Sequence, residues 1–141
     1  MNTITKLQEK FGSTDLDHLL EAYGDVDIPV ISGEPQHQGD LFVIPTREGN
    51  ADTMLQVPLE GIAVIRGEAG GNTHLLMAEG EVLFSPTTPQ RGSVVLGNLW
   101  VKKGATAILH HIEHGYNLVG EGFYSMRGKR TQMDEIRRVA D

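Results

Sequence analysis

The chain of 141 residues contains no cysteine. This absence excludes disulfides, thiolate metal sites and cysteine nucleophiles, and it leaves the cytosol as the default compartment. Long hydrophobic runs are also absent, since the longest fall far short of the ~20 apolar residues that a membrane-spanning helix needs. The N-terminal stretch "MNTITKLQEKFG" has neither an apolar core nor a small-residue cleavage site, so we expect no secretory signal and no membrane partner.

Positive charge is scarce. The chain has 12 lysines and arginines against 19 aspartates and glutamates, and its net charge is −7. Proteins that bind nucleic acids usually present a basic patch, because their cations replace the counterions of the phosphates. The one basic cluster, between Arg127 and Arg138, is interpreted as a solvated terminal segment. We therefore expect no nucleic-acid partner.

Glycine, by contrast, is abundant, with 17 residues. Short runs of β-branched and aromatic residues alternate with Gly- and Pro-containing turns, which is typical of antiparallel β-structure. The expected strands cover residues 40–45, 61–67, 73–78, 81–85, 94–101, 106–112 and 122–128. This pattern predicts a mainly β fold, either an antiparallel β-sandwich or a small barrel of the jelly-roll or cupin-like kind. Between two of these runs, Glu79-Gly80 predicts a β-hairpin turn.

Residues 1–27 are predicted to form a helical arm, and residues 28–141 a β-domain with a short C-terminal helix. Apolar residues recur in the arm at helical spacing. They are Ile4, Leu7 and Phe11, followed by Leu16, Leu19, Leu20 and Tyr23. In the C-terminal tail, Ile136 and Val139 are expected to face the β-domain. An arm of this kind packs either on its own domain or on a neighbouring copy, and the sequence leaves both open.

Three of the six histidines stand close together in "HHIEHG". Alternate residues of a strand share a face, so His110 is expected on one face and His111 with Glu113 on the other. A bend at Gly115 would bring His111 and His114 together. Imidazole is a common ligand of transition metals, and three ligands with one open position are usual in catalytic sites.

The residue best placed to complete such a set is His74, which begins an expected strand after a glycine-rich turn, whereas His37 lies outside the set. The candidate ligands of a zinc, iron, nickel or manganese ion are therefore His74, His111, His114 and Glu113. Such a site predicts a pocket lined by Trp100 or Tyr116. The alternative is that these histidines are structural and bond to the backbone at a strand end. The spacing matches neither HExxH nor the paired histidines of the usual cupin motif.

Several stretches together resemble a family of small β-domain proteins from bacteria and tailed phages, most of them without an assigned function. These stretches are "HQGDLFVIP", "RGEAGGNTHLL", "HIEHGYNLVGEGFYSMRG" and "EIRRVAD", within residues 36–141. The resemblance implies that the four candidate ligands are polar landmarks of the family. Asn72 stands where the family pattern has a second histidine, and "GKRT" replaces an acidic–aromatic ending. A structural protein tolerates such departures from the family pattern more easily than an enzyme does.

Two hypotheses follow. The first is a non-catalytic accessory or assembly module, attached to a capsid or another large particle and forming a homo-oligomer, which would be cytoplasmic or virion-associated. The second is a cupin-like metal protein or a metal-dependent enzyme that acts on a small molecule. No serine stands in a G-x-S-x-G setting and no nucleotide-binding fingerprint is present, so we assign no catalytic and no cofactor-binding residues.

Overall fold

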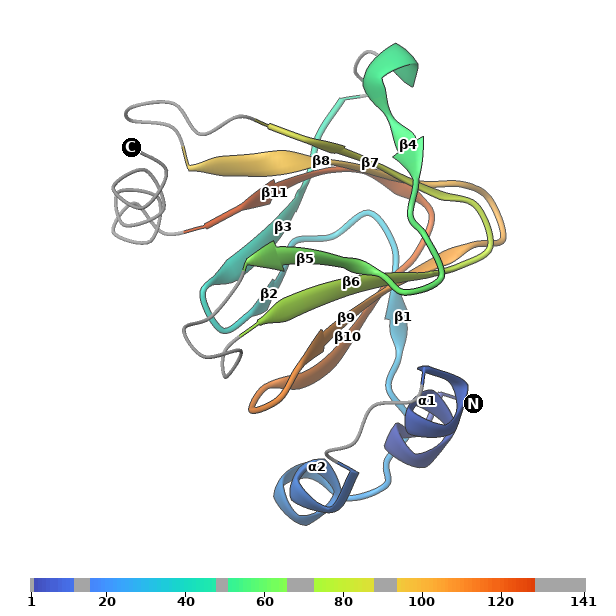
Figure 1. The fold of residues 1–141 in the computed structure, drawn as a ribbon, viewed down its shortest axis with the longest axis vertical. Coiled ribbons are helices and arrows are strands. Elements are labelled where there is room, and N and C mark those ends of the chain that lie inside the picture. The colour runs from blue at the N-terminus through green and yellow to red at the C-terminus, as the bar shows by residue number, and fades with distance from the viewer. Residues whose placement is uncertain (1, 12–15, 48–50, 66–72, 88–93, 129–141) are drawn as a thin grey trace.

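The computed structural model describes residues 2–11, 16–47, 51–65, 73–87 and 94–128. These residues form two β-sheets packed face to face, with two short helices below one of them (Figure 1). The predicted β-sandwich is therefore confirmed, and the two sheets do not close into a barrel. The expected C-terminal helix, with Ile136 and Val139, lies outside the described residues.

The first sheet has five strands in the described residues. Their spatial order is β1 (Val30–Ile31), β10 (Gly115–Val119), β9 (Thr106–His111), β6 (His74–Glu79) and β5 (Ile62–Ile65). Strand β1 runs parallel to β10, whereas the other neighbours are antiparallel. Strands β1 and β5 therefore form the two edges of this sheet.

The second sheet has six strands in the described residues, all antiparallel to their neighbours. Their order is β2 (Gln36–Gln38), β3 (Leu41–Pro45), β11 (Gly122–Arg127), β8 (Val95–Val101), β7 (Val82–Pro86) and β4 (Leu55–Gln56). A single turn of 3-10 helix, η1 (Ala51–Thr53), precedes β4. The chain passes directly from β1, at one edge of the first sheet, to β2, at one edge of the second sheet.

The turn at Glu79-Gly80 is not a hairpin, which corrects the sequence prediction. Gly80 does adopt a positive φ of 85°. The strands on either side, however, belong to different sheets, since β6 pairs with β5 and β9 whereas β7 pairs with β4 and β8. The turn thus carries the chain from one layer to the other. Two strands of alternating apolar residues joined at a glycine fit a hairpin and a turn between two sheets equally well, because each strand buries one face in either case.

The sequence prediction also missed strand β10. Gly115 and Asn117 interrupt its apolar pattern, and glycine and asparagine are both depleted in strands. Asn117 is nevertheless accommodated, because its amide donates to the carbonyl of His37 at 3.0 Å. The strands β1, β2 and β4 were missed because two or three residues are too few to show a period.

Apolar side chains from the facing sides of both sheets form the main core. Leu76, Leu109 and Val119 of the first sheet are fully buried there with Leu99 and Met126 of the second. Alternate positions along each strand supply these residues, as the period of two requires. Side chains next to them in sequence point to the outer faces.

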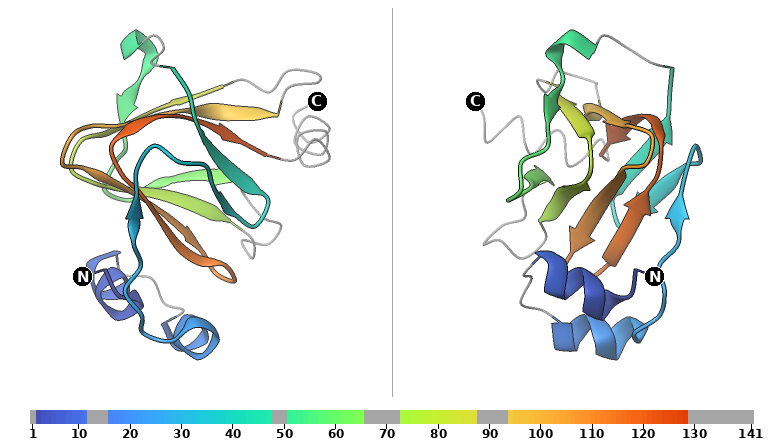
Figure 2. Two further views of the ribbon diagram at one scale, coloured as in Figure 1. Left: turned by 180° about the vertical axis from the view of Figure 1, so that it is seen from behind. Right: turned by 90° about the vertical axis from the view of Figure 1, so that its right-hand side faces the viewer.

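The helices α1 (Ile4–Phe11) and α2 (Leu16–Tyr23) cover the outer face of the first sheet (Figure 2). A second apolar cluster lies between them. It contains Ile4, Leu7 and Leu19 of the helices with Met77, Ile108, Tyr116 and Leu118 of the sheet. Within a single chain, the arm thus packs against the outer face of the first sheet. Among the described residues, no helix has the length and apolar character needed to cross a bilayer.

The buried hydroxyl of Tyr124 joins two connections of the sandwich. It accepts a hydrogen bond from the backbone N–H of Gly33 at 2.8 Å and donates to the carbonyl of Gly120 at 2.9 Å. The ring is fully buried, and burial raises the pKa of this phenol. The loop between β1 and β2 is thereby fixed to the turn between β10 and β11.

We predict that Tyr124→Phe lowers the free energy of unfolding by about 1–3 kcal/mol, because it removes the partner of the Gly33 N–H in a part-buried bond and of the buried Gly120 carbonyl. Urea unfolding measures the change. The control is Tyr23→Phe, which also removes a hydroxyl that donates to a backbone carbonyl, but from a side chain that is 45% exposed. Equal losses in the two variants would contradict the prediction.

Candidate functional site

One end of the sandwich gathers four polar residues from three places in the chain. His74 begins β6, His111 ends β9, His114 lies in the turn that follows, and Gln38 ends β2. His74 and His111 are buried, with exposed fractions of 3% and 2%. They alternate with core residues of their strands, so both point between the sheets.

The three imidazoles lie in a row. The ring centroids of His74 and His111 are 4.4 Å apart, and those of His111 and His114 are 4.5 Å apart, with interplanar angles of 42° and 35°. His114 is exposed and lies over Gly39, where an added Cβ would come within 2.6 Å of its Nε2. The row therefore leads from the interior of the sandwich to its surface.

The carboxamide of Gln38 determines the tautomer of His74. Its Nε2 donates to the carbonyls of Leu109 and Gly115, at 2.9 and 3.0 Å. Its Oε1 is therefore the atom that faces Nδ1 of His74, at 3.0 Å, and it must accept. The proton of the neutral His74 ring then lies on Nδ1, and Nε2 carries a lone pair.

His111 has the opposite tautomer. Its Nδ1 accepts the backbone N–H groups of Glu113 at 3.0 Å and of His114 at 3.1 Å. An atom that accepts two N–H groups carries no proton, so in the neutral ring the proton lies on Nε2. The side chain of His111 thus closes the turn that follows its own strand.

Burial keeps the two inner rings neutral. Together with the nearby His111 and His114, it lowers the pKa of His74 to about 4, whereas Asp40 acts in the opposite direction. Burial also lowers the pKa of His111, followed by the effect of His114, whereas Glu113 opposes this shift. At neutral pH both rings are therefore uncharged.

Two further amides extend this polar layer along the side of the sandwich. The Nε2 of Gln36 donates to the carbonyl of Leu118 at 3.3 Å, and its Oε1 accepts from Asn117 at 3.3 Å. The sequence prediction missed Gln36, Gln38 and Asn117. In "QHQ", Gln36 and Gln38 are separated by one residue and therefore share a face, but this spacing does not show that the face is buried.

Among the predicted ligands, the structure brings together His74, His111 and His114, and the bend before Gly115 joins the last two as expected. Glu113 does not join them, since it is exposed and contributes its backbone N–H. In the part of the chain that the structure describes, no group of three or more histidine or carboxylate side chains is placed to hold a metal ion. The rings stack rather than converge on one point.

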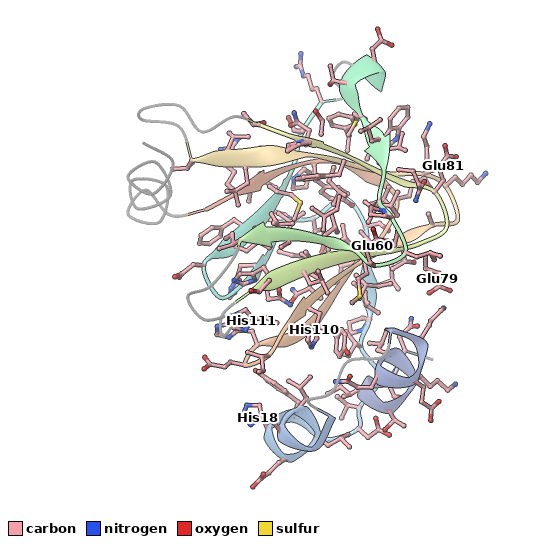
Figure 3. All side chains as sticks on the ribbon, viewed as in Figure 1. His18, Glu60, Glu79, Glu81, His110 and His111 are labelled. Atoms are coloured by element: carbon pink, nitrogen blue, oxygen red, sulfur yellow. The ribbon has the colours of Figure 1, made fainter. Side chains whose placement is uncertain are left out.

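The predicted lining by Trp100 or Tyr116 is wrong. Tyr116 lies on the outer face of the first sheet beside His110, with ring centroids 4.9 Å apart, and belongs to the cluster under the arm. Figure 3 shows His110 on the side of β9 that faces the arm. Trp100 lies in the second sheet next to Phe123, under the ammonium of Lys102. Alternation along their strands places both aromatic rings on faces opposite to that of the histidine row.

Residues 37–129 match a protein family described as a domain of unknown function (DUF8820), and the chain belongs to this family. The match includes the whole histidine row and Gln38 but begins after the helical arm. No curated protein and no solved structure matches the chain.

We predict that acid destabilises the fold through His74. A folded-state pKa below the ordinary value of 6.5 means that His74 contributes stability above about pH 6.5, which is lost as the pH falls towards 4. The shift corresponds to about 3 kcal/mol between the two limits. Urea unfolding of the wild type and of His74→Gln at neutral and acidic pH measures it.

The His74→Gln variant should lose less stability on acidification than the wild type. The control is His18→Gln, which makes the same substitution at a histidine that is exposed on α2. An identical pH dependence of the wild type and His74→Gln would show that His74 is not the group responsible.

Proposed function

We propose that the chain is a non-catalytic β-sandwich module that acts as an accessory or assembly protein. The observation that carries this proposal is that the polar side chains around His74 and His111 are bonded to other parts of the fold. The carboxamide of Gln38 joins the two sheets and bonds to His74, and Nδ1 of His111 closes a turn. These bonds have a structural purpose that needs no substrate.

The surface supports a role in protein binding. Two leucines near the edge strand β4 project into solvent, Leu55 with 73% and Leu59 with 97% of its surface exposed. Strand β4 pairs with β7 on one side only. Exposed apolar side chains at a sheet edge are typical of surfaces that contact other proteins.

The form of assembly that we propose is a homo-oligomer attached to a capsid or another large particle. The resemblance to small β-domain proteins from bacteria and tailed phages supports attachment to a particle. The net charge of −7 favours a protein partner over nucleic acid. Closed symmetry is the usual outcome when copies of one soluble chain associate.

This proposal predicts that the purified protein is a homo-oligomer and that His114→Ala has the same mass in solution. His114 is exposed, so its removal should leave the fold intact. Size-exclusion chromatography with light scattering, over a wide range of protein concentration, makes the measurement. A wild type that is monomeric at every concentration would contradict the assembly role.

A second candidate is the cupin-like metal protein, and one observation favours it. His74 donates its Nδ1 proton to a carboxamide and keeps a lone pair on Nε2, which is the arrangement found in histidines that bind metal ions. His111 is less suited, because a metal on its Nε2 would displace the proton that the neutral ring carries there. Binding would therefore require the three rings to reorient.

The metal candidate predicts about one zinc, iron, nickel or manganese ion per chain after reconstitution. Mass spectrometry of metal content tests it, with His74→Gln as the variant that should lose the ion. His111→Asn is a second variant, since an asparagine oxygen can accept the turn N–H groups while offering no Nε2. Wild-type protein without metal after reconstitution would remove this candidate.

A further inference from the structure

Exposed large hydrophobic side chains occur in two places among the described residues. Three of them lie where the arm joins the sandwich, from the last residue of α2 to the first residue of β1. They are Tyr23 with 45%, Val26 with 57% and Val30 with 43% of the surface exposed. The other two, Leu55 and Leu59, lie near β4. The connecting segment thus presents apolar surface that the single chain does not cover.

The arm and the first part of this segment form one unit. The backbone N–H of Asn2 donates to the carboxylate of Asp27 at 2.7 Å, and that of Thr5 donates to Asp25 at 2.9 Å. The N–H of Ile28 donates back to the carbonyl of Asn2 at 3.0 Å. These bonds hold residues 25–28 to the start of α1, so the chain passes from the arm to the sandwich at Pro29.

Polar contacts in the described residues join the arm to the sandwich at its surface. Tyr23 donates to the carbonyl of Glu113 at 2.6 Å, and Lys10 pairs with Glu79 at 2.6 Å. Figure 3 shows Glu79 at the end of the sandwich next to the arm. The apolar cluster adds a contact that is not directional.

One buried group indicates that this contact is imperfect. Gln8 of α1 is only 4% exposed, yet neither atom of its carboxamide has a hydrogen-bond partner in the described structure. A buried amide without partners opposes the packing that buries it. The arm can therefore leave its own sheet more easily than its apolar area alone would suggest.

We propose that the arm is exchanged between two copies of the chain. The arm of each copy packs on the outer face of the partner's first sheet and makes there the contacts seen within one chain. The two connecting segments then run past each other, and Val26 and Val30 become covered. The exchange deepens the proposed assembly role, on which it rests, by naming the partner surface. Its symmetry is twofold, because the same two surfaces meet twice.

The absence of native cysteine allows a direct test. Lys10 and Glu79 form a pair across the arm contact and are both about half exposed, so they tolerate substitution. Lys10→Cys and Glu79→Cys are made in separate chains with different tags, co-expressed, and treated with a short bis-maleimide. Exchange predicts a cross-link between the two chains, which non-reducing gels and mass spectrometry detect.

Two controls make the result decisive. The double variant, Lys10→Cys with Glu79→Cys in one chain, shows that the two thiols react when they are in reach. A third pair combines Lys10→Cys with Thr53→Cys, an exposed position in η1, which lies at the opposite end of the molecule from the arm (Figure 1). Exchange requires several-fold more cross-linking to Glu79→Cys than to Thr53→Cys. Equal yields, or cross-links within the double variant alone, overturn the exchange.

The connecting segment supplies an independent measurement. Val26→Asp and Val30→Asp should each reduce the cross-link between chains and the fraction of dimer. Loss of the dimer in Leu59→Asp alone would instead place the interface near β4 and would overturn the exchange. An unchanged dimer in both valine variants would overturn the proposal. If the protein is oligomeric but shows no cross-link between chains, the assembly role stands and only the exchange fails.

Discussion

The carboxamide of Gln38 is the contact on which the histidine end depends. Gln38 belongs to the second sheet, but it donates to two carbonyls of the first and accepts from His74. One side chain therefore fixes the spacing of the two layers at this end and the tautomer of a buried imidazole. Replacing it with an apolar residue would remove its hydrogen bonds to two backbone carbonyls and leave Nδ1 of the buried His74 without this partner, which is costly.

From this contact follows the character of the whole row. His74 is held with its proton towards Gln38, and His111 is held with its proton on the opposite nitrogen by two backbone N–H groups. Both rings are buried, and their lowered pKa values keep them uncharged at neutral pH. Only His114 is exposed to solvent. The arrangement resembles a buried polar layer between two sheets more than an open reaction site.

The sequence predicted the parts of the fold that local periodicity encodes. Seven strands were found from their β-branched runs, the two helices from their apolar spacing, and the meeting of His111 with His114 from the bend at Gly115. Sequence could not show that Glu79-Gly80 joins two sheets, because a hairpin and a crossing turn need the same residues.

The role of Gln38 was not predictable for a different reason. Its partners lie 36 to 77 positions away in the chain, so only the packed fold reveals them. Glutamine is also a common surface residue, and nothing in its immediate neighbours marks it as buried. The predicted placement of Trp100 and Tyr116 beside the histidines was wrong for another reason. It assumed a pocket and did not consider which face of its strand each residue occupies.

The contact between His114 and Gly39 has an evolutionary consequence. A side chain at position 39 would collide with the imidazole, since an added Cβ would lie 2.6 Å from its Nε2, and the backbone there has a positive φ of 55°. A lineage that replaces the glycine with asparagine, the residue that best tolerates this backbone, therefore has to move the exposed imidazole aside or replace it with a smaller residue. The effect of a substitution at position 39 thus depends on the residue at position 114.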